Sequence, residues 1–177
     1  QTLPPEYAEP DYLLRALAMP NDPAFQEGRL WGLHNIDEQE GRVDADIDGP
    51  EAWDIKRDAS EIIVAVIDTG IRYTHQDLAE NMWVNEGEIP GDGLDNDGNG
   101  VVDDIHGLNA RDEDLQGDPN DDNGHGTHCA GTIGAVGNNG LGLTGVAWNV
   151  QLMAARFLGG PDGTGSTADS IECIDYA

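Results

Sequence analysis

A run of six apolar residues, Ile62 to Ile67, ends directly at the carboxylate of Asp68. The run does not alternate with polar residues, so it predicts a strand buried on both faces of a parallel sheet. A second such strand is expected at residues 150–158, after a helix of small residues at 124–136. Ser166 and Asp169 form a capping signature at the start of a further helix, whose apolar spacing continues to Tyr176. This order of elements indicates an α/β fold with helices on both faces of the sheet, ending here after its second strand–helix unit.

The charge of the chain excludes several function classes. Its 177 residues carry 35 acidic and 8 basic side chains, a formal net charge of −27. Binding to nucleic acid or to an anionic membrane surface needs clustered Lys and Arg, so we expect neither partner. Two cysteines cannot build a disulfide framework, and no apolar run approaches the ~20 residues that cross a bilayer.

Two polar residues at the ends of these elements suggest proton-transfer chemistry. Asp68 lies at the carboxyl end of a buried strand, where active sites of open parallel sheets gather, and a carboxylate there needs a partner. His125 begins the small-residue helix, with Asn123 as a possible cap, and the helix dipole at that end should help the imidazole to stay neutral. Asp68 would fix the tautomer of His125 and stabilise its cation. The alternative is a zinc site built from His125, His128 and Cys129.

Both segments resemble the motifs of the subtilisin-like serine proteases. Val64–Ile71 with His75–Leu78 resembles the catalytic-aspartate motif, Gly124–Thr132 the catalytic-histidine motif, and Gly140–Ala147 a third, downstream segment. The resemblance implies an N-terminal portion of a serine endopeptidase of the thermitase-like branch, with catalytic Asp68 and His125. The family's nucleophilic serine lies downstream of Ala177, so this chain alone is expected to be inactive.

The resemblance also implies the partners and the domain boundaries. The partners would be a polypeptide substrate and the remainder of the peptidase domain. Residues 1–18, rich in proline, resemble a propeptide tail or linker, and residues 19–177 the N-terminal part of the peptidase domain. Autoprocessing would then fall between Tyr12 and Asn21. The alternative for residues 1–30 is an ordinary extended, proline-rich arm, and the alternative for the whole chain is a non-catalytic calcium-binding module on the same scaffold.

The acidic residues concentrate in one segment. Residues 86–122 hold thirteen Asp or Glu residues and a single Arg, a density that repels itself unless cations bind there. Within it, oxygen-bearing side chains alternate with small residues, as in the opening of a calcium loop. The expected ligands are Asp95, Asp97, Asn99, the carbonyl of Val101, and Asp103 or Asp104.

A second calcium site follows only from the family resemblance. Its ligands would be the side chains of Asp22, Asp77 and Asn139 (or Asn138) and the carbonyls of Val136, Leu141 and Leu143.

Three further expectations also come from the resemblance. The segment Gly163–Thr164–Gly165 would bind an extended substrate by strand pairing. Cys129 would lie beneath the catalytic histidine, as in thiol-dependent members. Secretion is expected from the family and from calcium use, although no export signal is visible in the sequence.

Overall fold

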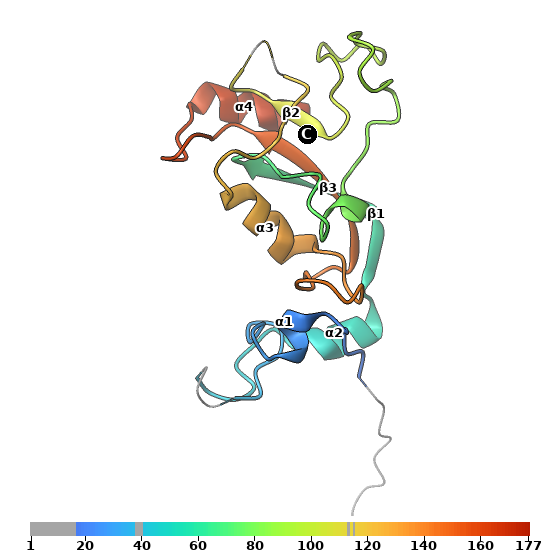
Figure 1. Ribbon diagram of the computed structural model, residues 1–177, viewed down its shortest axis with the longest axis vertical. Coiled ribbons are helices and arrows are strands. Elements are labelled where there is room, and N and C mark those ends of the chain that lie inside the picture. Colours follow the sequence, from blue (N-terminus) through green and yellow to red (C-terminus); the bar gives the residue numbers. More distant parts are fainter. Residues whose placement is uncertain (1–16, 38–40, 113, 115) are drawn as a thin grey trace, which may run out of the picture.

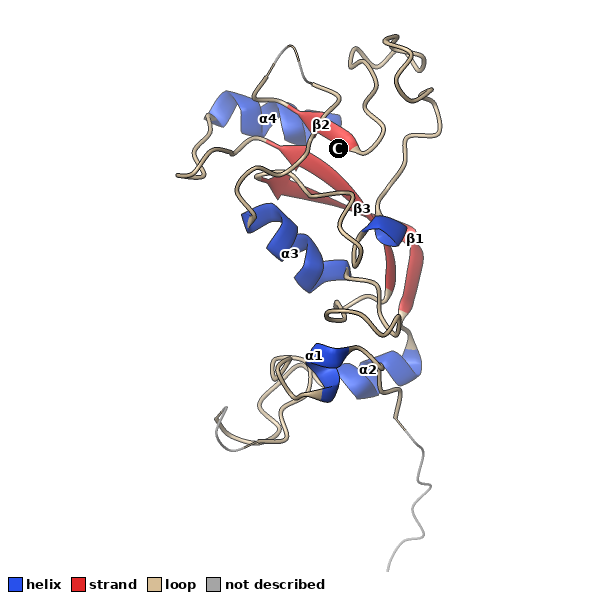
Figure 2. Ribbon diagram, in the orientation of Figure 1, coloured by secondary structure: helices blue, strands red, loops and turns tan. Residues whose placement is uncertain are grey.

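The computed structural model describes residues 17–37, 41–112, 114 and 116–177. Their arrangement is drawn in Figure 1 and coloured by secondary structure in Figure 2. No helix among these residues has the length and apolar character that spanning a membrane would require. In chain order the elements are α1 (Pro23–Gln26), α2 (Gly49–Ile55), β1 (Asp58–Asp68), the 3-10 helix η2 (Ala79–Asn81), β2 (Gly107–Asn109), α3 (His125–Gly134), β3 (Asn149–Arg156) and α4 (Thr167–Tyr176).

The three strands form one parallel sheet in the order β1-β3-β2. Asp68 at the end of β1 is in register with Arg156 at the end of β3, so the strands finish at a common edge. The α/β fold expected from the sequence is therefore confirmed. Strand β2 was not predicted, because its three residues lie inside a long polar segment without any apolar run.

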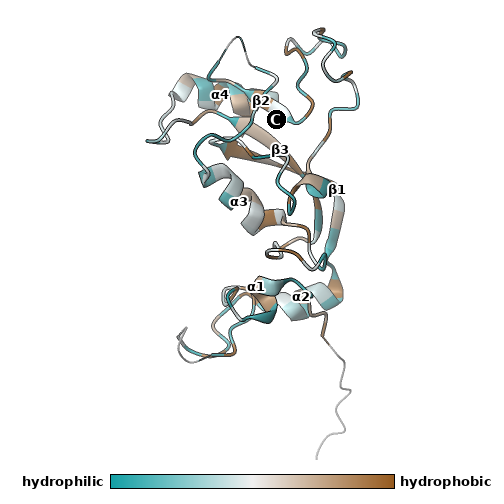
Figure 3. Cartoon of the chain, viewed as in Figure 1, coloured by the Kyte–Doolittle hydropathy of each residue, from teal (hydrophilic) through white to brown (hydrophobic). Residues whose placement is uncertain are grey.

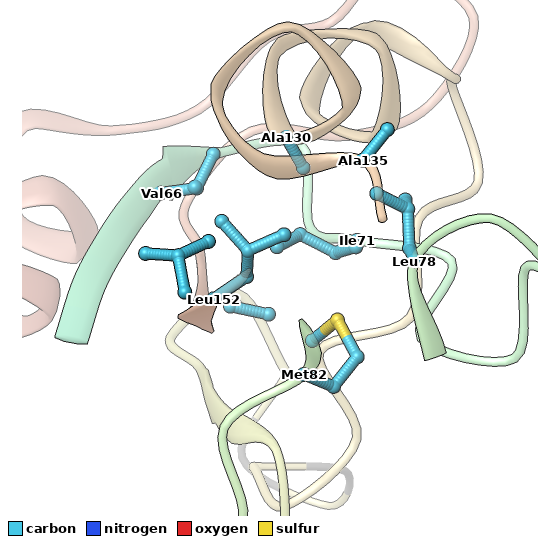
Figure 4. Packing of buried hydrophobic residues seen from close by; sticks show 9 residues of the cluster. Val66, Ile71, Leu78, Met82, Ala130, Ala135 and Leu152 are labelled. Atoms are coloured by element: carbon cyan, nitrogen blue, oxygen red, sulfur yellow. The ribbon is translucent and has the colours of Figure 1, made fainter. Parts of the chain in front are cut away.

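Helices cover both faces of the sheet. Adjacent residues of β3, Ala154 and Ala155, point to opposite faces and belong to two separate clusters of buried side chains. The cluster under α3 also contains Leu78 and Met82, the two residues that flank η2. It is drawn in Figure 4. The smaller cluster, on the α4 side, consists of Val101, Leu108, Ala155 and Cys173.

One expectation about burial was wrong. The run from Ile62 to Ile67 forms a strand, but Ile62 and Ile63 remain 53% and 48% exposed and only Val66 is fully buried. The reason is that, within the part of the chain that the structure describes, β1 is an edge strand that pairs with β3 alone. Helix α4 likewise leaves Ile171 and Ile174 more than half exposed. Strand β3 is instead mostly buried, and its ribbon carries mainly apolar colours in Figure 3.

The N-terminal segment packs as a separate small layer beside the sheet. Helix α2 begins with Gly49–Pro50, where the fixed φ of proline suits the first helical turn. The Trp53 indole N–H donates to the Val146 carbonyl at 2.8 Å, and its ring lies 5.3 Å from that of Trp148. The expected extended arm also contains the short helix α1, which lies alongside α2 in Figure 1. Most of the expected propeptide tail, residues 1–16, lies outside the described residues.

Candidate active site

Asp68 and His125 meet at the edge where the parallel strands end. The Nδ1 atom of His125 lies 2.8 Å from Oδ1 and 2.9 Å from Oδ2 of Asp68. The Asp68 side chain is 14% exposed, whereas that of His125 is 66% exposed. With Nδ1 engaged by the carboxylate, Nε2 is the ring atom left for proton exchange.

Glycine allows β1 and α3 to approach closely enough for this contact. A Cβ atom on Gly126 would clash with the carbonyl of Gly70, and one on Gly70, whose φ is +95°, would clash with Pro119. The Gly126 N–H instead donates to the hydroxyl of Thr69 at 2.8 Å. The small-residue composition of this helix therefore serves close packing at the site.

The electrostatics of His125 differ from the sequence expectation. The helix dipole was expected to keep the ring neutral, but the hydrogen bond to Asp68 and the charge of Asp68 raise the pKa of His125 above its ordinary value. Asp121 contributes in the same direction. The nearby carboxylate outweighs the helix end, because it contacts the ring directly. The α3 N-terminus itself is capped at Gly124, while Asn123 Oδ1 accepts from the His125 N–H at 3.2 Å.

Cys129 lies one turn after His125, with its sulfur 3.8 Å from the imidazole Nδ1. Burial, followed by the charge of Asp68, raises the pKa of its thiol. The ligand atoms of Asp68, His125 and Cys129 lie within 4.8 Å of one another, but the exposed His128 does not join this group. The zinc arrangement considered from the sequence, with both histidines, is therefore not formed.

The segment expected to bind substrate forms a small hairpin near the histidine. Gly159 and Thr164 make an antiparallel bridge, and Thr164 and Gly165 are exposed while Gly163 is partly buried. The Asn123 side chain donates to the Gly160 carbonyl at 2.8 Å, which ties this hairpin to the loop before His125. An exposed edge of this kind can pair with an extended peptide.

The residues named for the resemblance-based calcium site do come together. Asp22 and Asp77 are only 0% and 3% exposed, and no salt bridge to either is found among the described residues. Asn139 joins them: its backbone N–H donates to Asp22 at 3.2 Å and its side chain to Asp77 at 2.9 Å. The Leu143 N–H also donates to Asp77, the Leu141 N–H donates to Asn139, and the Val136 N–H donates to the Asp77 carbonyl. Two buried carboxylates without a cationic partner fit a hard cation, because buried charge is costly when unpaired.

The acidic loop also gathers a metal-ligand group, which contains two of the expected ligands, Asp95 and Asp97, together with Glu88. Carboxylate oxygens of Glu88, Asp95 and Asp97 lie within 4.8 Å of one another and could hold a metal ion. Asp103 accepts the Gly91 and Gly93 N–H groups, so its oxygens organise the loop. Asp104 is fully buried and accepts from Asn85, Asn99 and Tyr176, while Val101 is a core residue.

Glu88 was missed by the sequence analysis. It lies seven positions before Asp95 and outside the alternating pattern, so spacing gave no signal for it. Its carboxylate accepts the backbone N–H groups of Asn96, Asp97 and Asp103, which folds the loop around it.

Comparison with known proteins identifies the family of the chain. The profile of the Subtilase family matches residues 59–177. Among curated relatives, Subtilisin-like protease 1 of Plasmodium vivax is 47% identical over 114 residues, covering 64% of this chain and 18% of that protein. Thermophilic serine proteinase of Bacillus sp. (strain AK1) is 36% identical over 172 residues, covering 97% of this chain and 34% of that protein. A solved protease from Pseudoalteromonas arctica PAMC 21717 superposes with a TM-score of 0.59 at 27% identity, over 89% of this chain and 43% of that one.

These observations define an α/β protein with an aspartate–histidine pair at the carboxyl edge of its sheet. The chain belongs to the subtilase family of serine peptidases. It spans 18% to 34% of the length of the two curated relatives above and less than half of the solved protease.

Proposed function

We propose that this chain is the N-terminal part of a subtilisin-like serine endopeptidase that hydrolyses peptide bonds in polypeptides. The carrying observation is the contact between His125 Nδ1 and Asp68, at 2.8 Å and 2.9 Å to its two oxygens. His125 acts through Nε2 as the general base that removes the proton of a serine hydroxyl as the oxygen attacks the scissile carbonyl. Asp68 holds the tautomer of the ring and stabilises the imidazolium that forms. The same imidazolium then protonates the leaving amine.

The serine is assigned to a segment outside these 177 residues, so the chain alone is inactive. Its partner is the remainder of the peptidase domain. Support comes from four apolar side chains that are each about half exposed or more, Ile62 and Ile63 of β1 and Ile171 and Ile174 of α4. The unpaired edge of β1 adds free backbone donors and acceptors there. Continuation of the sheet and its covering helices would bury both features.

The exposed hairpin at Gly163–Gly165 is assigned to the substrate backbone. Its position is supported by the bond from Asn123 to Gly160, because Asn123 lies two residues before His125. Pairing with this edge would place the scissile bond of the peptide near the imidazole of His125. The match to Thermophilic serine proteinase, which extends over the N-terminal arm, supports placement in the thermitase-like branch.

Calcium is assigned to both acidic sites. At the first, the buried carboxylates of Asp22 and Asp77 and the oxygen of Asn139 supply hard ligands between the N-terminal arm and the loop after α3. At the second, Glu88, Asp95 and Asp97 supply them. Bound calcium would neutralise part of the −27 charge and stabilise the folded state by mass action. Calcium use suits a secreted protein, because extracellular modules bind calcium at millimolar concentrations. Residues 1–18 are assigned to a propeptide tail or linker.

A serine-directed fluorophosphonate tests the proposal on the full-length gene product. We expect one covalent adduct per molecule, which disappears in His125→Ala because the serine is no longer activated. The control is His128→Ala, which changes an exposed histidine on the same helix and should leave labelling intact. Absence of labelling in a folded, calcium-loaded wild-type protein would instead support the non-catalytic calcium-binding module.

A further inference from the structure

The side chain of Asp121 joins the two segments that carry Asp68 and His125. Its Oδ1 accepts the hydroxyl of Thr69 at 2.9 Å, from the segment after β1. Its Oδ2 accepts both the backbone N–H and the hydroxyl of Thr127, at 3.0 Å and 2.5 Å, from the first turn of α3. Oδ1 also accepts the N–H groups of Asn123 and Gly124, each at 2.9 Å. One carboxylate thus receives five hydrogen bonds from segments more than fifty residues apart.

Each threonine extends this link. The Thr69 hydroxyl accepts the N–H of Gly126, the residue after His125, at 2.8 Å. The Thr127 hydroxyl accepts the N–H of Arg72 at 3.0 Å, four residues after Asp68. We call Thr69, Asp121 and Thr127 the Asp121 clamp. Its hydrogen bonds connect Thr69, which follows Asp68, with Gly126 and Thr127, which follow His125.

The bonding pattern distinguishes Asp121 from the carboxylates assigned to cations. Asp121 accepts three hydrogen bonds on Oδ1 and two on Oδ2, whereas Asp22 and Asp77 accept one on each side-chain oxygen. The larger number leaves little lone-pair capacity for a metal ion at Asp121. Burial would raise the pKa of Asp121, but the bonds from Gly124, Thr127 and Asn123 outweigh it and lower that pKa. The carboxylate is therefore ionised near neutral pH, and its charge adds to that of Asp68 in raising the pKa of His125.

We propose that Asp121 is a positioning residue for peptide hydrolysis, which holds the imidazole of His125 against Asp68 through Thr69 and Thr127. This inference rests on the proposed function, because it assigns Asp121 a part in the same proton transfer. The mechanism is geometric: the pair lies on two separate elements, and a displacement of about 1 Å between reacting groups can cost on the order of 100-fold in rate.

The test is Asp121→Asn in the full-length gene product. An amide presents one oxygen, so either the Thr69 side or the Thr127 side of the clamp meets an NH₂ group that cannot accept. We expect kcat to fall about 10- to 100-fold with KM within about twofold, because a misplaced base impairs the chemical step more than binding. The acidic limb of the profile of kcat/KM against pH should move to lower pH, since a negative charge near His125 is lost.

The matched control is Asp118→Asn, which removes the same charge from an exposed aspartate in the same loop. Asp118 accepts from Tyr73 and Asn120 and has no bond to the clamp, so kcat and the pH profile should stay as in the wild type. If Asp121→Asn does not fold, Thr127→Val decides: it keeps the charge, removes the hydroxyl, and should lower kcat about fivefold.

Three outcomes separate a failure of this inference from a failure of the proposed function. If Asp121→Asn lowers only the melting temperature, with kcat and the pH profile unchanged, the residue is merely structural and the inference is overturned. The same holds if Thr127→Val retains full kcat where the aspartate variant cannot be purified. If His125→Ala retains wild-type activity, the proposed function itself fails, whatever Asp121→Asn does.

Discussion

Three carboxylates around α3, those of Asp68, Asp77 and Asp121, are chemically the same as those of Asp95, Asp97 and Asp103 in the acidic loop, but the two groups hold the fold in different ways. Asp68, Asp77 and Asp121 accept hydrogen bonds from residues 52 to 66 positions away in the sequence. Asp95, Asp97 and Asp103 accept from donors within 12 positions. Losing a carboxylate of the first group should separate parts of the molecule, whereas losing one of the second should loosen only its own loop.

The largest expected effect is that of Asp68→Asn on peptide hydrolysis. The amide can present an N–H to His125 and so favour the wrong tautomer, and it cannot stabilise the imidazolium. We expect kcat of the full-length gene product to fall about 10⁴-fold, the size of effect measured for this change in serine proteases. Asp95→Asn serves as the loop comparison and should leave kcat within about twofold. Equal losses in both variants would contradict the distinction between the two groups.

The pH dependence sharpens the same comparison. Asp68 raises the pKa of His125 through its hydrogen bond and its charge. Since the base must be neutral, the acidic limb of kcat/KM should lie above pH 6.5, the ordinary value for histidine, and move down in Asp68→Asn. A raised pKa also contributes stability that is present below about 6.5 and lost as pH rises through the folded value. Chemical denaturation should therefore show a larger cost of Asp68→Asn at pH 5.5 than at pH 8.5.

The next largest expected effect is a loss of folding stability when the buried carboxylate of Asp77 is replaced. In Asp77→Asn an NH₂ group replaces an oxygen that accepts either from Leu143 or from Asn139, which leaves a buried donor unpaired. We expect a loss of about 2 kcal/mol in the free energy of unfolding, measured by urea titration with chelator present. The calcium proposal adds that chelator lowers the melting temperature of the wild type but has less effect on this variant.

The control for Asp77 is Glu80→Gln, three residues further on and exposed. It removes the same charge from the surface and should change stability by less than about 0.5 kcal/mol. A wild-type melting curve that is unaffected by excess chelator would refute a structural role for calcium.

A thiol reagent probes the space beneath His125. Cys129 has its sulfur 3.8 Å from the imidazole Nδ1, so a mercury atom bound there would displace the ring from Asp68. We expect stoichiometric mercuration to lower kcat about tenfold or more, by the same positional argument as for the clamp. Cys129→Ala should be resistant, while Cys173, fully buried and with a thiol pKa raised to about 11, should not react in the folded protein. Full activity of the mercurated wild type would contradict this geometry.

The features that could be predicted from the sequence are those set by residues close together in the chain. The run ending at Asp68, the capping pair Ser166 and Asp169, and the small-residue helix after Gly124 each lie within one short segment. Each formed the predicted type of element, although the strand ending at Asp68 is less buried than predicted. The capping box of α4 is complete, with both reciprocal bonds present. The contact between Asp68 and His125 could be anticipated because both sit at ends of elements that a parallel sheet brings to one edge.

The features that could not be predicted depend on contacts between distant segments. Glu88 folds the acidic loop around its carboxylate, yet nothing in its spacing marks it. Asp121 is one of several aspartates in a polar run, and only the structure shows that it bonds to Thr69 and Thr127. The exposure of Ile62 depends on which strands flank β1, which the composition of the strand itself does not determine.

The smallest expected effect is that of Asp95→Asn, in the acidic loop. Its carboxylate accepts the N–H groups of Gly98, Asn99 and Gly100, all within five residues. An asparagine oxygen can keep part of this turn, so we expect less than about 1 kcal/mol of lost stability without calcium. With calcium, the loss should grow as one ligand of the Glu88 group is removed. Isothermal titration with calcium should show weaker binding at the Glu88 group and unchanged binding at the Asp22–Asp77 site. Loss of binding at both sites would mean that the loop and the buried Asp22–Asp77 site are coupled.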